Sequence, residues 1–197
     1  MKILYIVPVI YQGGAERIVL NLAEYMQSQK NEVLVVALKG PLKIDNNSLN
    51  IKVLNLKSLL NLPFTFFSLL RIYYNFKPDL VHSHVFYSHF MTRIMKMFLP
   101  NHILLCSEHC TLKNIKYPFF NKIFLKITNF LANKNYNVSK EGTESYIGEK
   151  IFKKNEIKTI YNGIDINRFS NVELEKQFYL DQFNINDKVP IFLCVGR

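Results

Sequence analysis

Short apolar runs alternate along the chain with segments whose apolar residues recur at helical spacing. Residues 3–7 and 33–38 are almost continuously apolar, which is typical of strands buried on both faces of a parallel sheet. Between these runs, one face of a predicted helix is formed by Ile18, Val19, Leu22, Tyr25 and Met26. The first 38 residues therefore predict one strand–helix–strand unit.

The same alternation continues to residue 161. Further strands are predicted at 51–56, 80–83, 103–107, 135–138 and 157–161, separated by helices at 59–74, 86–98, 119–131 and 140–149. Steady alternation of this kind favours an α/β fold, a doubly wound parallel Rossmann-like sheet with helices on both faces.

The pattern weakens after residue 165. A polar segment follows, and then a buried-type strand at 190–195 with no helix behind it to cover it. We expect residues 1–170 to form the Rossmann-like domain. Residues 171–197 are expected to form an interdomain segment and the first strand of a second domain that is truncated here.

Composition excludes several classes of protein. The 197 residues are 49% hydrophobic, which is enough for a core and argues against disorder. The apolar run that begins at Ile3 is broken by polar and glycine residues from Gln12 and has no cleavage signal behind it, so we expect no signal peptide. The apolar stretch at residues 59–70 is too short to span a membrane. The three cysteines are too few for a disulfide framework, which favours a reducing cytoplasm.

The net charge of +10 indicates an affinity for anions, and its distribution is uneven. Residues 111–136 contain five lysines and no acid. The helix predicted at 119–131 places apolar residues on one face (Phe120, Ile123, Phe124, Ile127 and Leu131) and Lys122 and Lys126 on another. With Lys113 and Lys116 nearby, this helix is expected to lie on an anionic membrane, where a lipid-linked acceptor would be found. The alternative for this helix is packing into the domain's own core. For the protein as a whole, net charge alone also suggests nucleic-acid binding, but no nucleic-acid motif is present.

In an open α/β sheet, ligands bind beyond the carboxyl ends of the strands. Gly13 and Gly14 open a helix just after the first strand, and the free N–H groups there suit phosphate or carbohydrate oxygens. The third glycine of the dinucleotide fingerprint is missing, so a simple tight turn remains the alternative.

Histidines follow two other strands. His82 and His84 share one face of an extended segment, but only His89 is near and no carboxylate or thiol has ligand spacing, so a polar lining or a hydrogen-bonded core role is favoured over zinc. His109 follows the strand at 103–107, where its imidazole would point toward the ligand. A nucleophilic pair with Cys110 is disfavoured because neighbours in an extended chain face opposite ways.

Taken in order, the motifs GGAER, VHSH, SEH, VSK, YNGID followed by RF, and LCVGR resemble the N-terminal domain of the family 4 glycosyltransferases. These are retaining enzymes of the GT-B fold, with two Rossmann-like domains facing a cleft. The resemblance covers the whole chain and implies transfer of a sugar from a nucleotide-sugar donor to a glycan or lipid-linked acceptor. It places the chain in bacterial-type surface polysaccharide or glycolipid synthesis, in the cytoplasm or peripherally on the inner face of the cell membrane.

The resemblance also implies roles for single residues. His109 would be the catalytic contact to the transferred sugar, and His82 and His84 would line the cleft. Substrate and donor contacts are implied for Gly13, Gly14, Glu16, Asn162 and Arg197. No metal or other cofactor is expected, because basic residues and helix N-termini serve in its place.

The donor-binding lysine and paired glutamates of the family lie in the C-terminal domain, which is therefore an expected partner. The chain is expected to hold the acceptor side and to be inactive alone. A non-catalytic sugar- or nucleotide-binding remnant of a truncated gene is the chief alternative. A sugar-nucleotide epimerase of similar architecture is less consistent with the GGAER loop.

Overall fold

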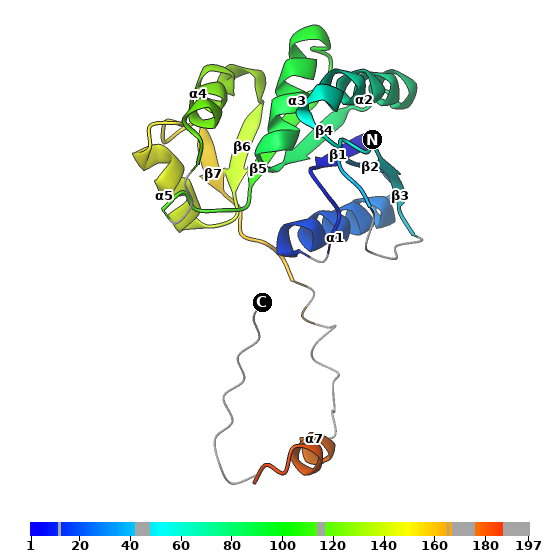
Figure 1. Cartoon of the computed structure of the whole chain (residues 1–197), viewed down its shortest axis with the longest axis vertical. Helices are drawn as coiled ribbons and strands as arrows, with labels where there is room; N and C mark the ends of the chain where they lie inside the picture. The colour runs from blue at the N-terminus through cyan, green and yellow to red at the C-terminus, as the bar shows by residue number, and fades with distance from the viewer. Residues whose placement is uncertain (12, 42–47, 114–116, 165, 167–175, 187–197) are drawn as a thin grey trace. The chain divides into compact units, whose positions relative to one another are not determined.

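The computed structural model describes residues 1–11, 13–41, 48–113, 117–164, 166 and 176–186 (Figure 1). The chain forms two units, Met1–Asn162 and Gly163–Arg197. In the second unit, one helix is described, α7 at Lys176–Gln182. The strand predicted at 190–195 and Arg197 lie outside the described residues, and the division at residue 170 stays a prediction.

The described residues of the first unit form a seven-stranded sheet in which every pairing is parallel. The strands are β1 (Lys2–Val7), β2 (Glu32–Ala37), β3 (Asn50–Val53), β4 (Leu80–His84), β5 (Ile103–Glu108), β6 (Lys134–Asn137) and β7 (Ile157–Thr159). Their spatial order is β3-β2-β1-β4-β5-β6-β7. This arrangement confirms the predicted α/β, Rossmann-like fold.

The helices between these strands agree with the predicted pattern except at their ends. They are α1 (Gly14–Ser28), α2 (Leu62–Phe76), α3 (Val85–Phe98), α4 (Phe119–Ile127) and α5 (Lys140–Gly148). The first three residues of the helix predicted at 59–74 form a 3-10 turn instead, and Pro63 lies in the first turn of α2, where proline is well tolerated. The helix predicted at 119–131 ends at Ile127 and is followed by a 3-10 turn, Asn129–Leu131.

A buried arginine explains why α4 ends early. The Arg93 guanidinium donates to the Leu125 carbonyl oxygen at 2.9 Å and to Thr128 Oγ1 at 3.1 Å. Thr128 Oγ1 in turn donates to the Phe124 carbonyl oxygen at 2.6 Å. The Arg93 side chain thus satisfies the Leu125 carbonyl group, which a longer helix would pair with its own N–H group.

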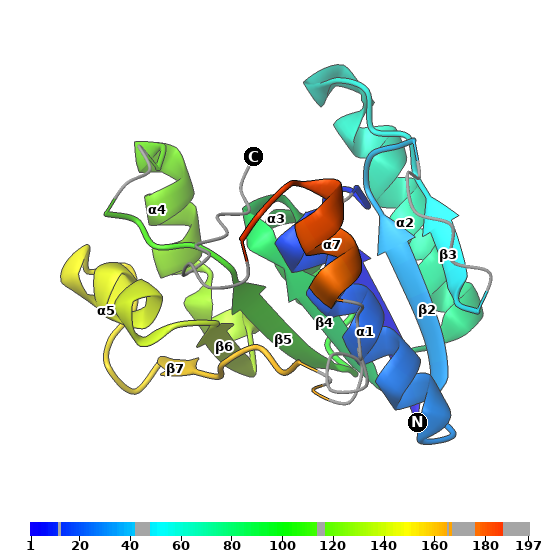
Figure 2. The ribbon, with the colours of Figure 1, turned by 90° about the horizontal axis from the view of Figure 1, so that it is seen from below.

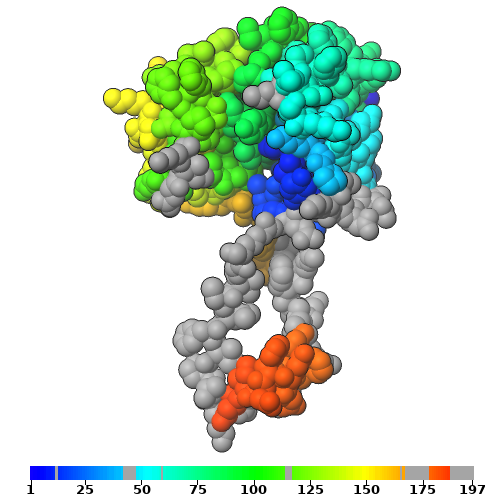
Figure 3. All heavy atoms as spheres, viewed as in Figure 1, coloured from blue at the N-terminus to red at the C-terminus, as the bar shows by residue number. Residues whose placement is uncertain are grey.

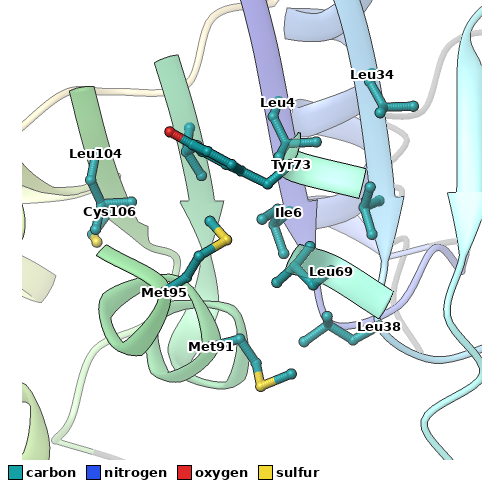
Figure 4. Packing of buried hydrophobic residues seen from close by; sticks show 12 residues of the cluster. Leu4, Ile6, Leu34, Leu38, Leu69, Tyr73, Met91, Met95, Leu104 and Cys106 are labelled. Carbon is teal, nitrogen blue, oxygen red and sulfur yellow. The ribbon is translucent and has the colours of Figure 1, made fainter. Parts of the chain in front are cut away.

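Residues of alternate strand positions pack on opposite faces of the sheet. Leu4, Ile6 and Leu34 pack with Leu69 and Tyr73 of α2 and with Met91 and Met95 of α3 (Figure 4). Ile3, Tyr5, Val33 and Val35 pack with Val19, Leu20 and Ala23 of α1 on the other face (Figure 2). A third cluster joins α3, α4 and α5 around Phe86, Leu125 and Tyr146. The continuous apolar runs in the sequence therefore reflect burial on both faces.

The strand order reverses between β1 and β4. The chain leaves β1 toward β2 on one side, whereas the later strands, β5, β6 and β7, lie beyond β4 on the other. At such a topological switch point the carboxyl ends of two neighbouring strands diverge and leave room for a ligand. The start of α1 and the end of β4 lie at this edge of the sheet.

Two glycines of α5 offer a matched test of the packing behind this edge. A Cβ on Gly142 would collide with the side chain of Asn137, which is buried and donates to the Cys110 carbonyl oxygen, whereas a Cβ on Gly148 would meet no atom within 4 Å. We predict that Gly142→Ala lowers the free energy of unfolding by about 1 to 3 kcal/mol through overpacking. Gly148→Ala should raise it by about 0.5 to 1 kcal/mol because alanine favours a helix. Urea unfolding measures both, and equal effects of the two substitutions would contradict the packing.

Candidate functional site

Three imidazoles meet at the carboxyl ends of β4 and β5. His84 Nδ1 lies 2.9 Å from His109 Nε2, and His82 Nε2 lies 2.8 Å from Ser107 Oγ. The ring centroids of His82 and His84 are 4.1 Å apart, and those of His84 and His109 are 5.2 Å apart. We call His82, His84 and His109 the histidine cluster. The rings of His82 and His84 adjoin Tyr5, so the cluster lies on the α1 face of the sheet.

Burial keeps the histidine cluster neutral at pH 7. Burial first, and then His89 and His109, lower the pKa of His82 to about 3. Burial and the neighbouring imidazoles hold the pKa of His84 well below its ordinary value. Burial lowers the pKa of His109 too, although the Glu108 carboxylate opposes this shift. A neutral imidazole has one donor and one acceptor nitrogen, so the cluster can hold a hydroxyl group but supplies no positive charge.

A charged pair lies on the opposite face of the same two strands. His89 of α3 places its Nε2 3.4 Å from Glu108 Oε1, and the side chains are 1% and 3% exposed. Burial lowers the pKa of His89, but Cys106 and Glu108 outweigh burial and raise it to about 9. Burial raises the pKa of Glu108, but His89, Tyr146 and Arg93 together outweigh burial, and the net shift is downward. His89 and Glu108 therefore form an ion pair at neutral pH.

The glycines that open α1 are partly covered. Gly13 is the N-cap and Gly14 the first residue of α1, and no side chain of a described residue caps the helix by a hydrogen bond. The Glu16 carboxylate instead folds back over Gly13, in the space that a Cβ would take. An anionic ligand at this helix N-terminus would have to displace Glu16, whereas a sugar hydroxyl could donate to its carboxylate. The binding roles of these three residues stay predictions.

The remaining predicted site residues are spread apart. Asn162 is exposed at the end of the first unit. Lys113 lies 3.3 Å from Glu141, and Lys122 lies 2.8 Å from Glu149. Lys126 is exposed and forms no ion pair with any described residue, while Lys116 lies outside them. Two of the four lysines assigned to an anionic surface thus already have a carboxylate neighbour.

Two alternatives from the sequence can be compared with the structure. Cys110 Sγ lies 3.6 Å from Tyr146 OH, while His109 bonds to His84, so these neighbours face different partners. Within the part of the chain that the structure describes, no group of three or more histidine, cysteine, aspartate or glutamate residues is placed to hold a metal ion.

The surface of α4 is unusually apolar for an exposed helix. Its large exposed side chains, with the following turn included, are Phe119 (70%), Phe120 (82%), Ile123 (38%), Ile127 (63%) and Phe130 (80%). We call these five residues the α4 apolar surface. The green atoms around α4 lie on the outside of the first unit (Figure 3). Phe124 and Leu131, predicted for the same face, are instead partly buried, and Phe124 packs against Phe90. No described helix is long and apolar enough to cross a membrane.

The sequence pattern missed the buried charges behind the histidine cluster. His89 and Arg93 are four residues apart on α3, a spacing that places both on one helix face. Glu108 was visible only as the middle letter of the SEH motif. The only signal in the sequence was that His89 and Arg93 lie on the buried side of an amphipathic helix. This signal indicates a buried ion pair only once Glu108 is known to face the helix.

The fold and this edge define a Rossmann-like α/β protein with imidazoles at a topological switch point. The sequence profile of Glycosyltransferase Family 4 matches residues 12–168, and the chain belongs to this family. No curated protein sequence matches the chain.

Among solved structures, the chain is similar to Anabaena Alr3699/HepE in complex with UDP and glucose, at 18% identity and a TM-score of 0.75, over 93% of this chain and 50% of that one. It is similar to a glycosyltransferase from Rickettsia africae at 18% identity and a TM-score of 0.72, over 96% of this chain and 51% of that one. It is also similar to the lipopolysaccharide outer core galactosyltransferase WaaB, at 16% identity and a TM-score of 0.66, over 84% of this chain and 47% of that one. The chain thus has the fold of one half of a GT-B enzyme and spans about half the length of these structures.

The neutral state of the histidine cluster predicts how stability depends on pH. The unfolded chain protonates His82 and His84 near pH 6.5, whereas the folded protein resists their protonation, so acid favours unfolding. We predict that the free energy of unfolding falls between pH 7 and pH 5. The slope should approach about 1.4 kcal/mol per pH unit for each proton that only the unfolded chain binds, or about 2.7 for this pair.

Urea unfolding at pH 7, 6 and 5 measures this slope. His84→Gln should reduce the slope by about 1.4 kcal/mol per pH unit, because it removes one group that takes up a proton only in the unfolded chain. A slope that His84→Gln leaves unchanged would show that His84 is protonated in the folded protein as well.

Proposed function

We propose that the chain forms the acceptor-side half of a glycosyltransferase that uses a nucleotide-sugar donor. The observation that carries this proposal is the histidine cluster at the carboxyl ends of β4 and β5, next to the switch point, in a chain of glycosyltransferase family 4. His109 is the member of the cluster with the least burial, since His82 and His84 are 9% and 3% exposed. We assign His109 to the transferred sugar, with His84 as its hydrogen-bond partner.

The chemistry of sugar transfer supports a division of labour between two halves. When the glycosidic bond to the donor breaks, the leaving nucleoside diphosphate gains negative charge, which oriented cations and N–H groups must stabilise. The histidine cluster is neutral, so it can orient a sugar hydroxyl but cannot neutralise a diphosphate. We therefore assign most donor contacts to a C-terminal family 4 domain, with Arg197 among them, and none to a metal ion.

Other functions have less support. The family match favours a transferase over a sugar-nucleotide epimerase. Nucleic-acid binding rests on net charge alone. A non-catalytic sugar- or nucleotide-binding module would keep the histidine cluster but lack turnover in any context, so an activity assay separates it from the proposed transferase.

The assay compares two proteins incubated with a mixture of nucleotide sugars and membrane extract. We predict no release of nucleoside diphosphate by residues 1–197 alone, because one wall of a cleft cannot hold donor and acceptor together. A two-domain protein that contains this chain with a family 4 C-terminal domain should release it. Comparable turnover by the single chain would place a complete donor site within it and overturn the half-enzyme proposal.

In the two-domain protein, His109→Ala should lower kcat by about 100-fold or more if the imidazole contacts the reacting sugar, and should change the melting temperature little. Cys110→Ala is the matched control, since Cys110 is the next residue but bonds to Tyr146, and it should retain turnover. Full turnover in His109→Ala would make His109 structural. Loss of turnover in Cys110→Ala would instead support Cys110 as a nucleophile.

We further propose that the protein acts at the inner face of the cell membrane, on a lipid-linked acceptor. The α4 apolar surface is the observation in favour, because five large apolar side chains that remain exposed can enter the interface of a bilayer. Lys126 on the same helix supplies a positive charge for anionic headgroups. Lys113 and Lys122 can contribute only beside Glu141 and Glu149, so we expect apolar insertion to outweigh charge.

Sedimentation with vesicles tests the membrane proposal. The chain should bind phosphatidylglycerol vesicles more strongly than phosphatidylcholine vesicles, and Phe120→Ser with Ile127→Ser should remove most binding. The matched control is Phe64→Ser with Phe67→Ser on α2, where the side chains are 74% and 67% exposed. The control should bind as the unchanged chain does. Equal loss in both variants, or equal recovery with both lipids, would contradict a specific α4 surface.

A further inference from the structure

The His89–Glu108 ion pair has no part in the contacts assigned so far, yet it is among the most deeply buried charged groups in the described chain. His89 Nδ1 lies 2.8 Å from Ser83 Oγ of β4, while its Nε2 faces Glu108 Oε1 of β5 at 3.4 Å. Ser83 Oγ also donates to the Leu105 carbonyl oxygen at 3.2 Å. One imidazole from α3 therefore bridges the carboxyl ends of two neighbouring strands.

This bridge lies directly behind the histidine cluster. Ser83 precedes His84 and Glu108 precedes His109, and consecutive residues of a strand face opposite sides of a sheet. The bridge thus occupies the α3 face, whereas the His84–His109 hydrogen bond occupies the α1 face. Each partner of that hydrogen bond is one residue from a partner of the bridge.

The backbone at the end of β4 makes this arrangement possible. Val85 has φ 66°, a left-handed conformation that is costly for a β-branched residue. It turns the chain from β4 directly into α3, so that His89, four residues later, comes back beneath Ser83. The strained turn and the bridge act on the same few residues.

We propose that His89 and Glu108 are a positioning pair, which holds the ends of β4 and β5 so that His84 and His109 keep one hydrogen-bonded arrangement with a single pair of tautomers. They are not catalytic residues, because they lie buried on the α3 face, behind the histidine cluster. The inference rests on the proposed function only for the role it gives to His109.

The energetics favour a positioning role over simple stabilisation. A buried ion pair loses the hydration of two charges, and a well-packed apolar pair is often as stable or more stable. Neither carboxylate oxygen of Glu108 has a hydrogen bond of normal geometry from a described residue, so its charge depends on nearby groups, among which His89 has the largest effect. An apolar pair would lack two contacts: the hydrogen bond between Ser83 and His89, and the charge contact between His89 and Glu108. Together these contacts link the ends of the two strands.

The test reads the tautomers of the histidines in residues 1–197 by long-range ¹⁵N–¹H correlation spectroscopy. The sequence has five histidines, so single substitutions assign every imidazole. In the unchanged chain, His84 and His109 should each show one tautomer. In Glu108→Gln and in His89→Gln, the Nδ1 and Nε2 shifts of His84 and His109 should move toward each other, as expected when two tautomers exchange.

The control is His102→Gln. His102 is also buried and bonds to Tyr73 OH at 3.0 Å, but it precedes β5 at the opposite edge of the sheet, so its loss should leave the His84 and His109 shifts unchanged. If Glu108→Gln and His89→Gln do not fold, Ser83→Ala takes their place, because it removes only the hydroxyl that holds His89.

Unchanged tautomers of His84 and His109 in the folded variants would overturn the positioning role. So would an equal change in His102→Gln, because the effect would then follow general loss of stability. The measurement involves no sugar transfer, so its outcome is independent of whether the proposed function holds.

Discussion

The parallel pairing of β4 with β5 is the constraint on which the candidate site depends. The register places Ser83 beside Cys106 and His84 beside Ser107, so the two strands end almost level at the same edge of the sheet. Because side chains alternate between the faces, the same few residues build a neutral histidine cluster on the α1 face and a buried charged group on the α3 face. A one-residue change of register would exchange these two environments.

The two faces differ in charge for a physical reason. On the α1 face the imidazoles have one another, Tyr5 and Ser107 as neighbours, and burial without a counter-ion keeps them neutral. On the α3 face Cys106 and the Glu108 carboxylate raise the pKa of His89, so that it gains a proton that its burial alone would remove. A neutral cluster suits the recognition of hydroxyl groups. The His89–Glu108 ion pair on the other face is suited to holding the ends of β4 and β5 in place.

Helix α3 connects the site to the rest of the molecule. Its His89 reaches β4 and β5, and Arg93, one turn later, holds the end of α4 through Leu125 and binds Asn135 of β6 at 2.7 Å. The α4 apolar surface is thus attached to the same helix that supports the histidine cluster. A membrane contact at α4 would be made on an element that a buried guanidinium links to β6.

The sequence by itself determined the alternating strands and helices, because the spacing of apolar residues within a short segment shows which of its faces is buried. It also singled out Gly13, His82, His84 and His109, since polar residues after buried strands stand out. It could not place Glu108 against His89, nor end α4 at Ile127, because both follow from contacts between segments far apart in the chain. Only the tertiary structure decided which imidazoles are neutral and which is charged, since the pKa of a histidine depends on neighbours that three-dimensional packing supplies.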